Sequence, residues 1–446
     1  MNKTFLQWRL GKLDSYQFYE KILQNEIDKL KEAKTEVYNY RKSRLSIGVT
    51  SLALDSTGQF LLASGEDGSV ALWALDESCS DGQLVNKRVH FARAETRPAK
   101  EKVDEKEYLS QRHVVMRRPI SVSTTNHSRW GQGAGAPGGS SGKFQASIES
   151  SIPRRDHDPQ VGFHAYSVTS VKWYSSDNGL FFTGSNDHKV KIWDTNTFQV
   201  ASSYDLGLRV AQLDACADLV AVATEDSHPR LLDLRSMSAT ISLGVKRTDM
   251  REGINTAKFS RHDTNSATAP LLLATGDNAG NVRVWDLRMS NQALCDLTEP
   301  DTMAKAHARC CNDICWDPNG SLELVTTGND GKCKMWALHN SQSRLIRQLG
   351  ATDVMANRFR RRTSHYLMWE GPYVFCNSDH GEILVYQSSN GRQWHSFQYP
   401  LSGSRDRLIT PRFQSMVMQT GLANSIGVRL VFGTDNTHGK IVQYKV

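Results

Sequence analysis

Five residues between positions 307 and 333 are of the types that bind metal ions. They are His307, Cys310, Cys311, Cys315 and Cys333. Imidazole nitrogen and thiolate sulfur are the ligands that Zn²⁺ prefers in proteins. The chain holds a second copy of this pattern, however, in which Val168 and Lys172 stand in place of cysteines. We therefore interpret these cysteines as ordinary strand residues and predict no metal and no cofactor.

The residue patterns of the common enzyme classes are missing from the sequence. It has no phosphate-binding glycine loop, nucleophile elbow, metalloprotease helix or paired Cys-x-x-Cys motif. The sequence therefore predicts a protein that is not an enzyme.

Two short motifs end in an arginine that follows an apolar stretch. One runs from Trp285 and Asp286 to Arg288, and the other from Asp233 to Arg235. A guanidinium group is a planar fork of donors that suits carboxylates and carbonyls. Two interpretations stay open: the arginines bind a partner protein, or each pairs with a neighbouring acid.

The densest basic run holds four arginines within five positions. They are Arg358, Arg360, Arg361 and Arg362. This run is expected in a connection between strands, where it either contacts nucleic-acid phosphate or an acidic partner, or stays a solvated loop. The net charge of +7 over 446 residues is a mild bias and does not decide between these alternatives.

These residues are set in a repeat that covers most of the chain. Each unit has small or apolar residues, then a Ser/Thr-Gly pair or a weaker equivalent, an acidic turn, and alternating apolar residues. We call the large aromatic or aliphatic residue at the end of the unit its anchor. The seven anchors are Trp73, Trp193, Leu232, Trp285, Trp336, Tyr386 and Tyr444. Period-two alternation indicates strands, and the Gly, Asn and Asp clusters indicate tight turns.

A histidine keeps a fixed spacing to the anchor in two units. His164 precedes Trp193 by 29 residues, and His307 precedes Trp336 by the same number. An aspartate lies six residues before each of these tryptophans. We predict that each histidine hydrogen-bonds with this aspartate and with a Ser or Thr near the anchor. Ala279 holds the aspartate position before Trp285, so that unit is expected to lack the full network.

The repeat is characteristic of WD-repeat proteins and predicts an all-β, seven-bladed β-propeller. The last unit has three strands, near 413–419, 429–432 and 441–444, before the chain stops. We predict that residues near 38–46 supply its fourth strand and close the ring.

Three regions follow from this organisation. Residues 1–44 form an N-terminal helix-loop-helix arm, residues 45–446 form the propeller, and residues 76–160 are a disordered, basic and Gly-rich insertion within it. The arm is expected to have a short helix before Gly11 and a longer one capped at Asp14 or Ser15. It either packs on the propeller or docks on another protein.

The cellular setting is constrained by what the chain lacks. Eight cysteines do not form a dense disulfide framework, which favours a cytosolic or nuclear protein. No stretch of about 18 uncharged apolar residues is present, so no membrane span is expected.

The paired Asp-x-Arg endings and the helical arm resemble WD-repeat substrate receptors of cullin-RING ubiquitin ligases. The segments 164–174 and 187–197 are similar to the Cockayne syndrome group A-type WD-repeat proteins. The resemblance implies a nuclear, non-catalytic receptor in transcription-coupled nucleotide excision repair. Its implied partners are the damaged-DNA-binding adaptor of the ligase, a Cockayne syndrome B-like ATPase and RNA polymerase II.

On this basis we assign partner binding to the arm and to the two arginine motifs. The residues are Phe5, Leu6, Trp8, Tyr19, Leu23, Ile27, Asp233, Arg235, Trp285, Asp286 and Arg288. The alternative is a chromatin- or nucleic-acid-associated WD-repeat scaffold without a ligase role, in which the basic run contacts DNA. A general scaffold without an adaptor is a third possibility.

Overall fold

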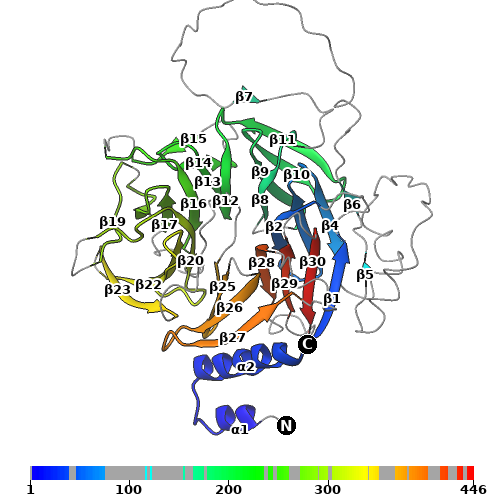
Figure 1. The fold of residues 1–446 in the computed structure, drawn as a ribbon, viewed down its shortest axis with the longest axis vertical. Coiled ribbons are helices and arrows are strands. Elements are labelled where there is room, and N and C mark those ends of the chain that lie inside the picture. Colours follow the sequence, from blue (N-terminus) through cyan, green and yellow to red (C-terminus); the bar gives the residue numbers. More distant parts are fainter. Residues whose placement is uncertain are drawn as a thin grey trace, which may run out of the picture.

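A computed structural model describes most of the arm and of the repeats. The described residues are 3–39, 47–75, 116–117, 121–122, 154–155, 164–174, 178–235, 240–244, 249–260, 272–289, 291–299, 304–339, 341–350, 367–378, 381–399, 412–419, 429–434 and 439–445. Within these ranges, the strands form seven sheets arranged in a ring (Figure 1). The seven-bladed propeller is therefore confirmed, and we number its blades along the chain.

The first three blades are built from the following strands. Blade 1 has β2 (Val49–Leu54), β3 (Phe60–Gly65), β4 (Val70–Ala74) and β6 (Ser121–Val122). Blade 2 has β8 (Val168–Trp173), β9 (Leu180–Ser185), β10 (Lys189–Asp194), β11 (Gln199–Asp205) and β7 (Arg154–Arg155). Blade 3 has β12 (Val210–Cys216), β13 (Leu219–Thr224), β14 (Arg230–Asp233) and β15 (Thr240–Ser242).

The remaining blades follow the same order. Blade 4 has β16 (Ile254–Phe259), β17 (Leu272–Asp277), β18 (Val282–Asp286) and β19 (Cys295–Asp296). Blade 5 has β20 (Cys311–Trp316), β21 (Glu323–Gly328), β22 (Cys333–His339) and β23 (Gln342–Leu349). Blade 6 has β24 (Leu367–Glu370), β25 (Tyr373–Asn377), β26 (Glu382–Gln387) and β27 (Gln393–Gln398). Blade 7 has β28 (Phe413–Gln419), β29 (Arg429–Thr434), β30 (Lys440–Lys445), β1 (Lys34–Asn39) and β5 (Met116–Arg117).

All seven predicted anchors lie on the third strand of their blades. The four tryptophans among them are almost completely buried. In blade 2, Trp193 is paired with Phe181 of the neighbouring strand, and the two rings stack at 5.5 Å between centroids. Burial of large rings contributes to the apolar stabilisation that a closed ring of small sheets needs.

The predicted histidine networks are confirmed in blades 2 and 5. His164 Nδ1 lies 2.8 Å from Asp187 Oδ2 and its Nε2 lies 2.6 Å from Thr183 Oγ1, to which Trp193 Nε1 donates at 2.7 Å. We call such a set of four residues a tetrad. Blade 5 repeats it at 3.0, 2.8 and 3.0 Å. The equivalent residues there are His307, Asp330, Thr326 and Trp336.

Blade 4 has the reduced version that Ala279 predicts. Trp285 Nε1 still donates to Thr275 Oγ1 at 2.8 Å. The neighbouring turn instead uses Asp277, which accepts a 2.9 Å hydrogen bond from the buried Arg283.

The innermost strands of adjacent blades run in the same direction. Thr50 and Thr169, near the start of β2 and β8, each donate to the carbonyl of the first residue of the next innermost strand. At the other end, Trp173 donates to Ala53 O and Trp316 donates to Lys258 O. These contacts fix which end of each of these blades faces which side of the ring.

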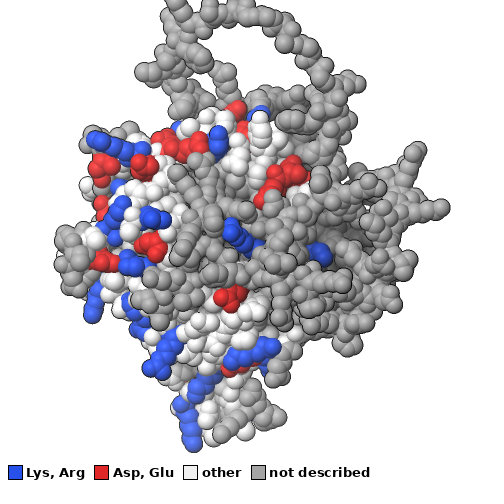
Figure 2. All heavy atoms as spheres, in the orientation of Figure 1, with Lys and Arg blue, Asp and Glu red and all other residues white. Residues whose placement is uncertain are grey.

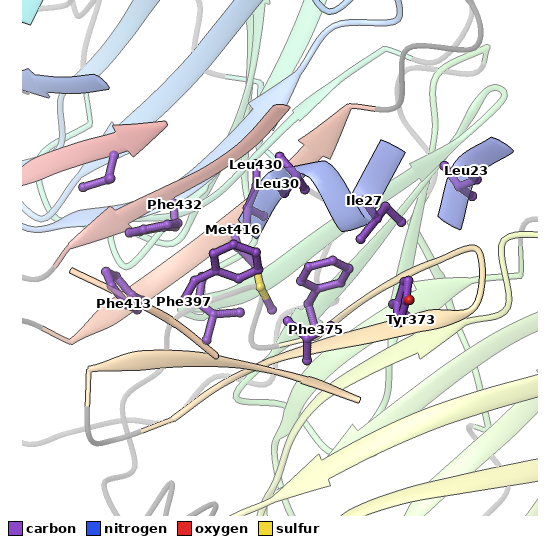
Figure 3. Packing of buried hydrophobic residues seen from close by; sticks show 13 residues of the cluster. Leu23, Ile27, Leu30, Tyr373, Phe375, Phe397, Phe413, Met416, Leu430 and Phe432 are labelled. Atoms are coloured by element: carbon purple, nitrogen blue, oxygen red, sulfur yellow. The ribbon is translucent and has the colours of Figure 1, made fainter. Parts of the chain in front are cut away.

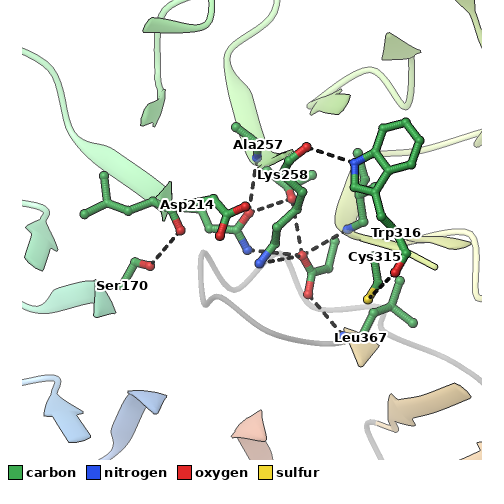
Figure 4. Close-up of polar contacts among 12 residues, drawn as sticks. Ser170, Asp214, Ala257, Lys258, Cys315, Trp316 and Leu367 are labelled. Atoms are coloured by element: carbon green, nitrogen blue, oxygen red, sulfur yellow. Dashed lines mark hydrogen bonds and ion pairs between the residues drawn. The ribbon is translucent and has the colours of Figure 1, made fainter. Parts of the chain in front are cut away.

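Polar side chains on these inner strands join blades 3 to 6 (Figure 4). The fully buried Asp313 accepts from Gln212 Nε2 and from the backbone N–H of Leu367, both at 3.1 Å. Lys258 Nζ lies 3.9 Å from the same carboxylate. Because a buried carboxylate is costly unless it is paired, these bonds hold the blades in one arrangement.

The ring closes between the two ends of the chain. β1 is antiparallel to β30, with Val37 opposite Val442 and Lys34 opposite Lys445. Closure by an N-terminal strand is confirmed, but that strand begins at Lys34, four residues before the predicted 38–46 segment. The helical arm ends at Glu32, so the extended chain begins earlier than expected. Residues 40–46 lie outside the described ranges.

Three short strands of the insertion are described, within a segment that the sequence predicts to be disordered. β6 is antiparallel to β4 as the fourth strand of blade 1, β5 is parallel to β1, and β7 is antiparallel to β11. These pairs are two residues long, too short to have a recognisable period in the sequence. The rest of 76–160 lies outside the described residues.

The arm consists of α1 (Lys3–Arg9), α2 (Ser15–Lys29) and a 3-10 turn, η1 (Leu30–Glu32). Asp14 caps α2: its side chain accepts from the backbone of Gln17 at 2.7 Å, while the Gln17 side chain returns a bond to the backbone of Asp14. This reciprocal pair satisfies two backbone donors that the start of a helix leaves free. In the described part of the chain, neither helix is long and apolar enough to span a membrane.

Candidate protein-docking face

One side of α2 is part of the propeller core (Figure 3). Leu23, Ile27 and Leu30 are buried, and they pack with residues of blades 6 and 7. Their neighbours include Tyr373, Phe375, Phe397, Phe413, Met416, Leu430 and Phe432. The assignment of Leu23 and Ile27 to partner binding is therefore wrong, because the helical period brings them against this chain's own sheet.

Close contacts fix α2 against the β24–β25 turn. A Cβ on Gly371, whose φ is +51°, would overlap the Leu23 side chain. Tyr373 donates to Asp28 Oδ1 at 3.4 Å, and Lys31 Nζ lies 3.8 Å from the centre of the Trp394 ring. A cation over an indole adds an electrostatic attraction to the apolar packing.

The first helix, by contrast, contacts the rest of the chain mainly through α2. The Trp8 ring stacks on Phe18 at 4.9 Å, and Phe5, which is half-buried, lies 6.2 Å from Phe18. The other side of α1 is open: Leu6 is 45% exposed and Leu10, just past its end, 69%. The side chain of Tyr19 lies outside the described parts of the structure.

The turns beside α2 define one face of the ring, which we call the arm face. In every blade the strands alternate in direction, so the turn after the first strand and the turn after the third lie on the same face. The Gly371 turn follows the first strand of blade 6 and contacts α2. Arg235 and Arg288 follow the third strands of blades 3 and 4. The arm and both arginines therefore share the arm face.

Both arginines bind acids of their own chain while staying exposed. Arg288 Nε and Nη2 donate to the two oxygens of Asp286 at 2.9 and 2.5 Å. Arg235 Nε donates to Asp218 Oδ2 at 2.7 Å, although its side chain is 79% exposed. Hydrogen bonds from Tyr174 and Arg235 lower the pKa of Asp218, and a bond from Arg288 lowers the pKa of Asp286. Each guanidinium is thus held in place by its carboxylate.

Not every residue of the two motifs is available to a partner. Trp285 is completely buried, so its assignment to partner binding is wrong: a ring that anchors the blade core cannot also be a surface contact. Asp286 is nearly buried and holds Arg288, and Asp233 accepts from the backbone of Arg235 at 2.9 Å. These two aspartates position the arginines.

Two apolar side chains on the arm face had no signal in the sequence. Met289, 48% exposed, follows Arg288 directly, and Leu322 lies in the turn after the first strand of blade 5. An isolated apolar residue in a turn matches no period, so only the fold places these side chains on the same face as the arginines.

Basic side chains surround the arm. Figure 2 shows Lys and Arg gathered on the edge of the ring where Figure 1 places α2 and α1. The exposed basic residues of the arm are Arg9, Lys12, Lys21, Lys29 and Lys31. An apolar helix surface with a basic surround suits a partner surface that combines apolar and acidic groups.

The cysteine-rich segment takes part in packing. Both ring nitrogens of His307 are engaged in the tetrad, while Cys311 and Cys333 belong to different hydrophobic clusters. Burial raises the pKa of Cys311 well above its usual value, which disfavours the thiolate that zinc requires. Among the described residues, no three His, Cys, Asp or Glu side chains are grouped as a metal site. The predicted patch of Arg358, Arg360, Arg361 and Arg362 lies outside the described residues.

Comparison with known proteins places this architecture in a family. The WD domain, G-beta repeat, matches residues 37–74, 160–194 and 299–337. Radiation-sensitive protein 28 of Saccharomyces cerevisiae is 31% identical over 97% of this chain and 97% of its own length. The WD repeat-containing protein ATCSA-1 of Arabidopsis thaliana is 33% identical over 28% of this chain and 27% of its own.

A solved structure shares the fold. The β-propeller domain of Cps50 (Swd1) from Myceliophteria thermophila superposes with a TM-score of 0.56 at 13% identity, covering 92% of this chain and 99% of that one. At this identity the likeness concerns the fold alone. With the full-length match to the yeast protein, the propeller and the helical arm, the chain belongs to the Cockayne syndrome group A-type WD-repeat proteins, a family of DNA repair.

Proposed function

We propose that this chain is a non-catalytic substrate receptor of a cullin-RING ubiquitin ligase, acting in transcription-coupled nucleotide excision repair in the nucleus. Its proposed partner on the arm face is the damaged-DNA-binding adaptor of the ligase. A Cockayne syndrome B-like ATPase and RNA polymerase II are the proposed proteins that it recruits. These partners rest on the family resemblance and on what the arm face offers.

The observation that carries the proposal is the exposed side of α1 on the same face as Arg235 and Arg288. Leu6, Trp8 and Leu10 present apolar surface that α2 leaves uncovered. Interfaces are commonly centred on such apolar and aromatic anchors, with arginines at high frequency. A short helix is also a common docking element for a groove on another protein.

The two helices of the arm have different tasks in this proposal. α2 is fixed to blades 6 and 7 by the buried Leu23 and Ile27, together with Leu30 of η1, so it holds α1 at a defined place beside the ring. The docking residues are therefore Phe5, Leu6, Trp8, Arg235 and Arg288, joined by Leu10 and Met289. A pre-positioned docking helix loses little conformational entropy on binding, which favours affinity.

The test is a binding measurement between the full chain and the purified adaptor of the same organism. We expect Leu6→Ala with Trp8→Ala to weaken binding by about 2 kcal/mol or more, because both residues are candidate hot spots. Arg288→Ala should also weaken it. Arg344→Gln is the matched control, since this exposed arginine lies on the outer strand of blade 5.

Two outcomes would contradict the proposal. One is that the wild-type chain shows no affinity for the adaptor. The other is that the α1 variant and the arginine variant both bind as tightly as the control, which would place any interface elsewhere. Tight, strongly salt-dependent binding to DNA without adaptor binding would instead support the nucleic-acid alternative.

A further inference from the structure

The face opposite the arm, which we call the tetrad face, places an arginine before several innermost strands. Innermost strands begin on this face, where the tetrads of blades 2 and 5 also lie. Four of the seven have an arginine within three residues of their start. They are Arg209 before β12, Arg251 before β16, Arg309 before β20 and Arg412 before β28.

These arginines lie on one side of the ring and close to its axis. The innermost strands line the axis. Contacts at their first residues show that β2, β8 and β12 start on the same face, and contacts between the third residues of β12, β16 and β20 extend this to blades 4 and 5. Blades 3, 4 and 5 are consecutive, so Arg209, Arg251 and Arg309 follow one another around an arc. The spacing in sequence is irregular, because the connections between blades differ in length, and the fold is what aligns them.

The charges on this arc are much less compensated than those on the arm face. Arg251 and Arg309 are exposed, and neither has an ion-pair partner among the described residues. Arg209 is 55% exposed and its Nε is 3.9 Å from Glu225, at the limit of an ion pair. Arg235 and Arg288, by comparison, are each bonded to a carboxylate at 2.9 Å or less.

We infer that this arc binds an acidic segment of another protein through carboxylate side chains. The guanidinium fork matches a carboxylate, and one arginine per blade suits a chain whose acidic residues are spaced apart. A polypeptide segment can bring single carboxylates to Arg209, Arg251 and Arg309 in turn.

The surroundings favour a peptide over nucleic acid. Glu225 lies beside Arg209, and the exposed Glu252 follows Arg251. A duplex laid across this face would bring its continuous row of phosphates against these acids, whereas a peptide can avoid them.

The inference is independent of the adaptor proposal. The arc and the arm face are on opposite sides of the ring, so an acidic segment and the adaptor can be bound together. Failure of one interaction in a variant leaves the other measurable.

The experiment measures fluorescence anisotropy of a fluorescein-labelled peptide of alternating glutamate and serine with the full chain at low salt. The test variant is Arg251→Gln with Arg309→Gln. The control, Arg344→Gln with Arg392→Gln, removes two exposed arginines elsewhere and changes the net charge equally. Thermal unfolding of each variant checks that the ring is intact.

We expect the test variant to bind about tenfold more weakly and the control to stay within about twofold of wild type. A glutamine version of the peptide should not bind. Equal losses in the two variants, or no binding of the acidic peptide by the wild type, would overturn the inference. So would a DNA duplex that binds more tightly than the peptide and depends on the same two arginines.

Discussion

The two helices of the arm have similar apolar patterns but opposite surroundings. In α2, Leu23 and Ile27 are buried between blades 6 and 7 and cannot reach a second protein. In α1, Leu6 and Trp8 remain exposed, although Trp8 stacks on α2. Helical periodicity in a sequence identifies an apolar side, and it leaves open whether the partner of that side is the same chain or another one.

This difference between α1 and α2 changes the role that the arm can have in binding. An arm that is free along its whole length would be a flexible tether, whereas α2 is part of the hydrophobic core next to the closing strand β1. The exposed helix α1 is consequently carried on a fixed support. The docking surface is smaller than the sequence predicted, and it is better positioned.

The largest expected effect is a difference in protein stability between a substitution in α2 and a substitution in α1. Ile27→Ala should lower the free energy of unfolding by about 3 kcal/mol, because it leaves a cavity in a packed cluster. Leu6→Ala should change it by no more than about 0.5 kcal/mol, as expected for an exposed side chain. Chemical denaturation of the full chain measures both.

Equal effects of the two substitutions would break the comparison. If Ile27→Ala were neutral, α2 would not be anchored to the propeller in solution. A large loss for Leu6→Ala would show that α1 is also part of the core.

A somewhat smaller effect is the loss of stability at low pH. Lowering the pH should weaken the tetrads of blades 2 and 5, and it should not affect the apolar contacts between α2 and the propeller. Burial lowers the pKa of His164 and His307 below 6.5, so the unfolded chain binds protons first and stability falls as the pH drops through this value. Burial would raise the pKa of Asp187, but the bond and charge of His164 and the backbone N–H groups of Ala165 and Lys189 together outweigh it and lower the pKa from 3.8 to about 2.

The lowered pKa of the aspartates also determines how the stability of the protein changes with pH. Asp187 and Asp330, both with a pKa of about 2, contribute stability above pH 3.8 that is lost as the pH falls toward 2. The expected contribution is on the order of 2 kcal/mol for each tetrad. Denaturation curves at several pH values measure it, with His164→Gln and His307→Gln flattening the loss between pH 7 and 5. A wild-type stability that did not change with pH in these ranges would contradict the neutral-histidine, ionised-aspartate tetrad.

Much of the ring could be predicted from the sequence, because its determinants are local. The Trp anchors, the His164 and His307 spacings and the three C-terminal strands recur at fixed offsets, and each is found where it was expected. The sequence predicts the closing strand too late in the chain, because it has no strong stop signal where the helical arm ends at Glu32.

The site was less predictable, because its contacts join distant positions. Arg288 pairs with Asp286, only two residues away, as one interpretation foresaw. Arg235 instead pairs with Asp218, 17 residues earlier, which requires the turns of one blade to be side by side. Whether Leu23 is buried or exposed depends on blade 6, which lies more than 300 residues later, and no local pattern contains that information.

The central claim is that α2 is anchored and α1 is the part offered to the adaptor. Hydrogen exchange of the full chain, alone and with the adaptor, tests it most directly. We predict protected amides in α2 and rapid exchange in α1 for the free chain, with protection of α1 and of the Arg235 and Arg288 turns on adding the adaptor. Rapid exchange throughout α2 in the free chain, or an α1 that the bound adaptor leaves unprotected, would contradict the account.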